Sequence, residues 1–117
     1  MDTLLLSKIL KNLGVSPALL GYRYSIYAVK LMFTDETYMY SLTKKLYPKI
    51  AIKYNTTADR VERAIRHAIE TGWIKGSESL QKDLFGYSIS SDKGKPTNSE
   101  FLTTVADYLR MLEDNNE

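Results

Sequence analysis

A cluster of long polar side chains lies in the stretch YNTTADRVERAIRHAIETGW at residues 54–73, and it consists of Arg60, Glu62, Arg63, Arg66 and His67. Helical spacing places Arg60, Arg63 and His67 on one face and puts Glu62 and Arg66 on an adjoining ridge. Arginine offers two parallel donors to O6 and N7 of guanine, and glutamate accepts from N4 of cytosine. A glutamate among arginines favours reading of base edges, because a purely electrostatic phosphate binder would repel it. The pattern therefore predicts a helix face that contacts DNA bases.

The same residues have two simpler interpretations. A charged helix face is commonly just solvated, and Glu62 and Arg66 have the i,i+4 spacing of a surface pair worth about 0.2–0.5 kcal/mol. Alternatively, the chain is a helical protein-interaction module whose charged helix meets an acidic protein partner. Salt-dependent binding that distinguishes one duplex from its scrambled version separates DNA reading from these alternatives, because phosphate contacts alone give salt dependence without discrimination.

The composition argues against an enzyme, a metal site and a bound cofactor. The chain has no cysteine and a single histidine, His67, so thiol catalysis, disulfides and Cys-ligated zinc are excluded. The sequence contains no second metal-ligand histidine, no P-loop and no catalytic dyad. No run of about 18 apolar residues is present to cross a membrane. A chain of this kind is expected in the cytoplasm.

Positive charge is concentrated around the polar cluster. The formal net charge of the chain is only +2. Residues 1–40 have a net charge of +1, residues 41–66 a net charge of +5, and residues 67–117 a net charge of −4. A polyanion would therefore meet its strongest attraction at the segment that carries the arginines.

The spacing of apolar residues predicts a helix-turn-helix at about residues 48–73. The first helix is expected at Pro48–Tyr54, the turn at Asn55–Thr57 and the second helix at Ala58–Trp73, in the order of a DNA-reading helix-turn-helix. Thr56 or Thr57 is expected to cap the second helix. The second helix should bury an apolar stripe, which consists of Val61, Ala64 or Ile65, Ala68 and Ile69.

The remaining segments are also helical in pattern, so we predict an all-α fold: a compact six-helix domain over residues 1–117. The other helices are expected near residues 2–14, 17–33, 38–54, 77–86 and 97–112. Pro48 should kink the third segment or divide it into two helices that meet at Tyr47–Pro48. Gly72 and Gly76 are expected at a frayed helix end. Thr97 and Glu100 form the pattern of a capping box.

Three stretches carry a resemblance to a known family: LYPKIAIKYNTTADRVERAIRHAIETGW, LFGYSIS and KPTNSEFLTTVADYLR. They resemble the DNA-binding effector domain of the master sporulation response regulator of endospore-forming Firmicutes, and the similarity spans nearly the whole chain. The resemblance implies a six-helix effector domain, which in the family follows a phosphorylatable receiver domain. No receiver domain is recognisable in these residues.

The resemblance also implies a function and partners. Family members recognise a short, repeated GC-containing DNA box upstream of sporulation genes, and they both activate and repress transcription. Phosphorylation of the receiver domain drives a homodimer onto tandem boxes of double-stranded DNA. The family also contacts the housekeeping sigma factor of RNA polymerase. The implied partners are therefore double-stranded DNA, a sigma factor and a second copy of the chain, with no membrane.

Residue roles follow from the same resemblance. The implied base-contacting residues are Arg60, Glu62, Arg63 and His67, with Arg66 nearby. The implied contacts to the DNA backbone are Lys53, Thr56 and Thr57 around the turn and Lys93, Lys95 and Ser99 near the last helix. The implied sigma-factor region spans residues 76–89 and includes Ser77, Leu80, Lys82, Leu84 and Ser88. The segment KGSESLQKDL, within that region, departs most from the family pattern.

Overall fold

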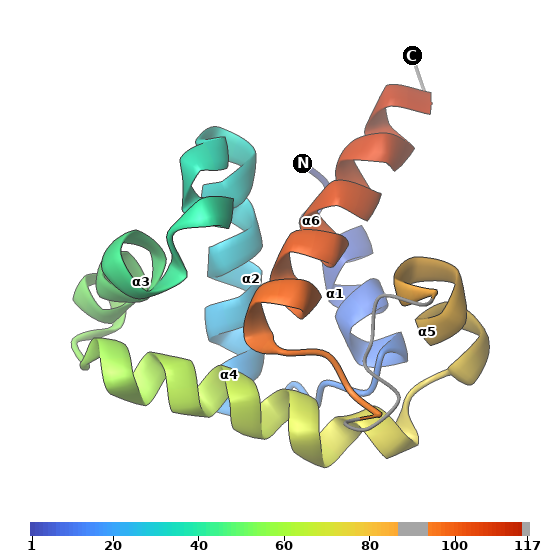
Figure 1. Ribbon diagram of the computed structural model, residues 1–117, viewed down its shortest axis with the longest axis horizontal. Coiled ribbons are helices and arrows are strands. Elements are labelled where there is room, and N and C mark those ends of the chain that lie inside the picture. Colours follow the sequence, from blue (N-terminus) through green and yellow to red (C-terminus); the bar gives the residue numbers. More distant parts are fainter. Residues whose placement is uncertain (87–93, 116–117) are drawn as a thin grey trace.

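Six α-helices form the chain in a computed structural model that describes residues 1–86 and 94–115 (Figure 1). The helices are α1 (Thr3–Asn12), α2 (Leu20–Thr34), α3 (Tyr47–Tyr54), α4 (Ala58–Gly72), α5 (Glu78–Phe85) and α6 (Asn98–Asn115). Two 3₁₀ turns, η1 (Glu36–Tyr40) and η3 (Trp73–Lys75), and a π-helix, η2 (Leu42–Leu46), lie between them. The described residues contain no strand, so the predicted all-α six-helix fold is confirmed.

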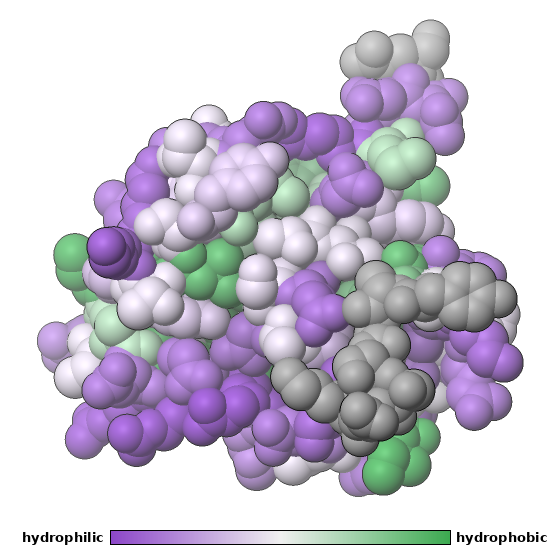
Figure 2. Space-filling view, in the orientation of Figure 1, coloured by the Kyte–Doolittle hydropathy of each residue, from purple (hydrophilic) through white to green (hydrophobic). Residues whose placement is uncertain are grey.

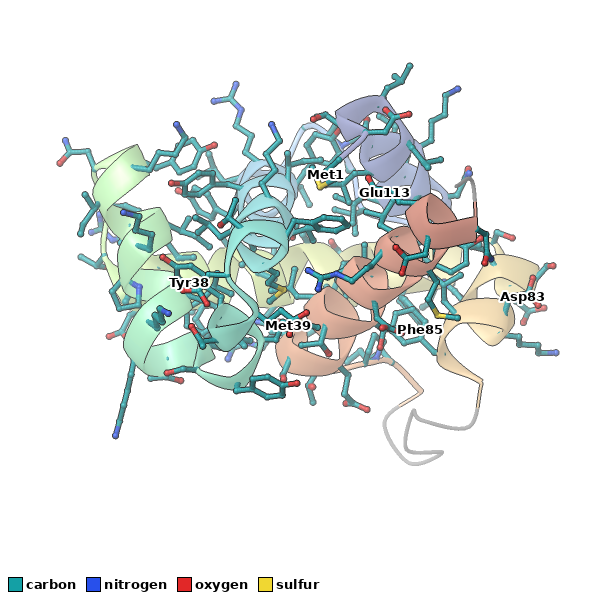
Figure 3. All side chains as sticks on the ribbon, turned by 90° about the horizontal axis from the view of Figure 1, so that it is seen from above. Met1, Tyr38, Met39, Asp83, Phe85 and Glu113 are labelled. Carbon is teal, nitrogen blue, oxygen red and sulfur yellow. The ribbon has the colours of Figure 1, made fainter. Side chains whose placement is uncertain are left out.

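Helix α4 forms the base of the molecule in the view of Figure 1, and α2 stands upon it. The two helices approach closely because Gly21 carries no side chain. A Cβ atom at Gly21 would lie 2.2 Å from the carbonyl oxygen of Ala64. Helix α6 runs beside α2, and Phe85 of α5 lies between α5 and α6 (Figure 3). The ring of Phe85 meets that of the buried Phe101 of α6, with centroids 6.1 Å apart. The core therefore lies on one side of α4, and α1, α2, α3, α5 and α6 all contribute buried side chains to it.

Side-chain caps begin several helices. Thr97 Oγ1 accepts from the backbone N–H of Glu100 at 3.1 Å, while Glu100 Oε1 accepts from the backbone N–H of Thr97 at 3.0 Å. The predicted capping box is therefore confirmed, and it satisfies two helix N-terminal donors reciprocally.

At the second helix the expected start is wrong. Ser16 Oγ accepts from Ala18 N–H in an isolated turn, and α2 begins at Leu20.

Two short helices meet at Tyr47 in the segment that contains Pro48, as predicted. The π-helix η2 runs directly into α3 at Tyr47, and the N–H of Tyr47 bonds the carbonyl of Leu42. A proline ring has no N–H and clashes with the carbonyl four residues earlier in an ordinary helix. A wider π turn before the proline changes the hydrogen-bond register at this point, and such turns are frequent at functional sites. The predicted irregularity at Tyr47–Pro48 is therefore present as a change of helix type.

The end of α4 is tightly packed, so the expected fraying at Gly72 and Gly76 is wrong. A Cβ atom at Gly72 would lie 1.8 Å from the carbonyl oxygen of Gly14, and one at Gly76 would lie 2.3 Å from that of Leu13. The backbone of the α1–α2 connection therefore crosses directly over the backbone of α4. Both glycines are required by this close approach, whereas the sequence pattern indicated only a helix end.

Candidate nucleic-acid interface

The turn between α3 and α4 is built from local side-chain chemistry. Asn55 adopts a left-handed backbone with φ of 53°, and the N–H of Thr56 bonds the carbonyl of Ala51 at 3.0 Å. Asparagine is one of the few residues other than glycine that enters this region readily. Thr57 then caps α4, because its Oγ1 accepts from the N–H of Arg60 at 3.2 Å. The helix-turn-helix thus forms without a turn glycine, and the predicted threonine cap is confirmed.

Helix α4 divides cleanly into a buried stripe and an open face. The buried stripe consists of Val61, Ile65, Ala68 and Ile69, each at most 1% exposed. Burying a side chain such as valine or isoleucine stabilises the fold by about 1.5–3 kcal/mol, so this stripe determines the helix orientation. The exposed face consists of Arg60, Arg63, Arg66 and His67, and Glu62 is half-buried. Figure 2 shows hydrophilic residues along the lower edge of the molecule, where α4 runs in Figure 1.

The open face contains one restrained arginine and two unrestrained ones. Arg66 donates through Nη1 to Glu62 Oε1 at 2.6 Å, and the two side chains are 52% and 33% exposed. A pair of this exposure contributes at most about 1 kcal/mol to stability. Arg60 and Arg63 have no ion-pair partner within residues 1–86 and 94–115. Both guanidinium groups therefore keep their donors available to an external acceptor.

The turn side of the interface carries the next candidates. Lys53 is exposed, and its Nζ lies 5.0 Å from the ring centroid of Tyr27 and 5.7 Å from that of Tyr54. These rings restrain the ammonium group, because a cation is attracted to an aromatic face within about 6 Å. Thr56 is half-buried and Thr57 is exposed. The Thr57 oxygen is engaged as a cap, which leaves its hydroxyl hydrogen free to donate.

The start of α6 comes to the side of α4, which the sequence did not predict. Asn98 Nδ2 lies 3.0 Å from the carbonyl oxygen of Glu62, although the two residues are 36 positions apart in the chain. A groove of about 610 Å³ lies between these elements and is lined by Glu62 and Arg66 on one side and by Lys95 and Ser99 on the other. Lys95 is half-buried and Ser99 is exposed. Lys93, the other candidate near this helix, lies outside the described residues.

A comparison with known protein families identifies the domain. A family model described as the C-terminal part of the sporulation initiation factor Spo0A matches residues 6–109. The chain belongs to the Spo0A C-terminal family. This family is the DNA-binding domain of a regulator of sporulation initiation, and it is a transcription-factor family rather than an enzyme family. The resemblance seen in the three sequence stretches is therefore confirmed.

Within the Spo0A C-terminal family domain, the region expected to contact a sigma factor, residues 76–89, includes the short helix α5. Ser77 caps α5 by accepting from the N–H of Leu80 at 3.2 Å. Leu80 and Leu84 are half-buried and pack against the core, while Lys82 is exposed. Ser88 lies outside the described residues. Lys82 is the charged side chain among these candidates and is exposed, whereas Ser77, Leu80 and Leu84 also support the fold.

Two residues at the interface of this Spo0A-family domain were not anticipated from the sequence. Asn98 and Tyr47 are 8% and 5% exposed, and their side chains share a hydrogen bond of 3.2 Å. Burial raises the pKa of the Tyr47 phenol, and the hydrogen bond from Asn98 opposes that change. The phenol therefore stays neutral at physiological pH. No local pattern marks either residue, because their contacts join helices that are distant in the chain.

Among the described residues, no group of three His, Cys, Asp or Glu side chains is arranged to hold a metal ion. The described helices also include none that is long and apolar enough to span a membrane. Neither observation bears on the arginine face, whose available chemistry is hydrogen-bond donation and positive charge.

Proposed function

We propose that this domain regulates sporulation genes by reading a short promoter box through α4, and that it activates some promoters and represses others. The observation that carries this proposal is the orientation of α4, with its apolar stripe buried and Arg60, Arg63 and His67 exposed on one face. A recognition helix in the major groove contacts base edges with residues of its N-terminal turns. Arg60 and Arg63 lie in those turns.

The roles of the individual residues follow from their positions. Arg60, Arg63 and His67 would contact bases directly, whereas the Glu62–Arg66 pair would present a restrained second ridge. Lys53, Thr56 and Thr57 would hold one stretch of backbone phosphates, and Lys95 and Ser99 another. Phosphate contacts of this kind position the protein on the duplex, and base contacts supply the discrimination.

Other partners are proposed on the family resemblance. A second copy of the chain would bind an adjacent box, driven by phosphorylation of a receiver domain. The region around α5 would contact the sigma factor of RNA polymerase, with the exposed Lys82 as its charged candidate. We place the protein in the cytoplasm, because it would bind chromosomal DNA there.

A random-duplex selection with the purified chain, read by sequencing, tests the central proposal. We expect one enriched motif, and binding to that motif should exceed binding to its scrambled version at every salt concentration. Equal, salt-sensitive binding to all duplexes would indicate phosphate contact alone. Absence of DNA binding, together with capture of an acidic protein domain, would favour the interaction-module alternative.

A further inference from the structure

In the part of the chain that the structure describes, Asn98 is the one polar residue of α6 that is buried. Its Nδ2 lies 3.2 Å from Tyr47 Oη and 3.0 Å from the carbonyl oxygen of Glu62. An amide nitrogen carries two hydrogens, so each can be donated to one of these acceptors. The carbonyl of Glu62 can only accept, which determines that the nitrogen of the amide, and not its oxygen, faces α4.

These two bonds join three helices at one point. Tyr47 begins α3, Glu62 lies in the second turn of α4, and Asn98 begins α6. A buried donor left without a partner costs about 1–3 kcal/mol. The start of α6 therefore cannot slide along α4 without losing these bonds, and the segment just before it is held in place as well.

The segment held in place carries positive charge beside the recognition helix. Lys95 and Ser99 flank Asn98 in sequence and line the groove opposite Arg66. Arg66 in turn pairs with Glu62, the residue whose carbonyl Asn98 engages. The Asn98 amide therefore links the two charged elements that border this groove.

We infer that Asn98 is a positioning residue for DNA binding. Its amide holds the start of α6 against α4, so that Lys95 meets the phosphates of the same duplex whose bases α4 reads. This inference rests on the proposed function, and it assigns to Asn98 no contact with DNA. Substitution should reduce affinity through Lys95 and not through lost stability.

The chain offers a matched control at the other end of α4. Gln81 is also a buried amide, 9% exposed, and its Nε2 donates to the carbonyl oxygens of Trp73 at 2.8 Å and Leu13 at 3.3 Å. Gln81→Ala and Asn98→Ala thus each remove a buried amide that donates to two acceptors. Asn98 ties α6 to α4, and Gln81 ties α5 to Trp73, the residue that follows α4. Only Asn98 lies beside the groove. A purely structural role predicts the same consequences for both variants.

The experiment measures binding of wild type, Asn98→Ala and Gln81→Ala to the selected duplex and to its scrambled version over a range of salt, below the melting temperature of every variant. We expect Asn98→Ala to weaken binding to the selected duplex roughly three- to tenfold, the range given by loss of about one net hydrogen bond. The slope of log K against log salt should become shallower by about one, as for one lost phosphate contact. Gln81→Ala should bind like wild type. Equal behaviour of the two variants would overturn the inference.

A double-mutant cycle tests whether Asn98 acts through Lys95. Lys95→Ala should itself weaken binding to both duplexes and reduce the salt slope by about one. Because the contact is then already lost, adding Asn98→Ala should produce little further change in affinity. Fully additive effects would show that Asn98 does not position Lys95. If Asn98→Ala fails to fold, Asn98→Leu replaces it in the cycle, because leucine keeps the approximate volume of the side chain and removes both donated bonds.

The failure of this inference and the failure of the proposed function give different results. If the wild-type chain does not distinguish the selected duplex from its scrambled version, DNA reading by α4 is wrong. If the wild type does distinguish them, but Asn98→Ala leaves the salt slope unchanged, only the positioning role is wrong.

Discussion

The two halves of α4 are held to the molecule by different means. The first half rests on apolar side chains, with Val61 and Ile65 fully buried beneath exposed arginines. The end of the helix adds backbone contact to its buried Ala68 and Ile69, since Gly72, and Gly76 just beyond the helix, leave no room for a side chain against the α1–α2 connection. A side-chain stripe leaves the opposite face free for a ligand, whereas a backbone crossing gives rigidity and no accessible groups. One helix thus keeps the backbone crossing at its end separate from the arginines at its start.

A buried amide from another helix also reaches the first half of α4, and a second one reaches the residue just after its end. Asn98 of α6 engages the first half at Glu62, and Gln81 of α5 engages the residue after the helix, Trp73. The two amides have similar burial and similar bond lengths but face different surroundings, a charged groove and the glycine crossing. Variants along the helix test whether stability and DNA reading are separated along α4 in this way.

Replacing the core of the first half should have the largest effect. Val61→Asp buries an unpaired carboxylate at a fully buried position, which costs several kcal/mol, on the order of the whole stability of a small domain. We expect loss of cooperative thermal unfolding, measured by circular dichroism. The matched control is Arg60→Asp, one residue earlier on the exposed face. It should keep the wild-type melting temperature and lose DNA binding. A folded Val61→Asp protein would show that the assignment of the buried face is wrong.

Filling the glycine crossing should be the next largest perturbation. A Cβ atom at Gly72 would lie 1.8 Å from the carbonyl oxygen of Gly14, so Gly72→Ala must displace backbone and should cost about 2–4 kcal/mol. Chemical denaturation measures this loss. Gly94→Ala is the control, because its φ is 67° but no atom lies within 4 Å of a Cβ placed there. That variant should lose only about 1 kcal/mol from backbone strain. Equal losses of stability in Gly72→Ala and Gly94→Ala would show that the backbone crossing at Gly72 has no special role in stability.

Removing an arginine from the reading half should affect binding and not stability. Arg63→Ala is expected to weaken binding to the selected duplex by about 1–3 kcal/mol and to relax preference at one base pair. The melting temperature should stay near that of the wild type because the side chain is exposed. Fluorescence anisotropy with a panel of single-base variants of the selected duplex measures how far the base preference is relaxed. An equal loss on the selected and scrambled duplexes would count against base readout by Arg63.

The smallest expected effect is a loss of stability in acid. It arises in the connection that leads into α3, outside both halves of α4. The hydrogen bond from Lys45, together with those from Thr37, lowers the pKa of Asp35 from 3.8 to about 2. The unfolded chain therefore binds a proton at higher pH than the folded one, and the stabilisation present above pH 4 is lost as pH falls toward 2. Asp35→Asn should make urea stability less dependent on pH in this interval. Lys45→Ala should do the same, since it removes the principal cause.

Much of the reading half of α4 was predictable from sequence because its determinants are local. Apolar residues at helical spacing predicted the buried stripe, and the position of the threonines predicted the cap of α4. The same reasoning predicted the capping box at Thr97 and Glu100. It was wrong about the end of α4, because a glycine near a helix end looks the same whether the end is free or crossed by another backbone.

The amino-acid sequence by itself determined which elements form and which side of α4 faces water, since both depend on interactions over three or four residues. The tertiary structure alone decided which elements meet. It brought Asn98 to Glu62 over 36 positions and placed Gly72 against Gly14. Such contacts depend on the angles and distances at which helices cross, and these result from the packing of the whole core. No short stretch of residues contains that information.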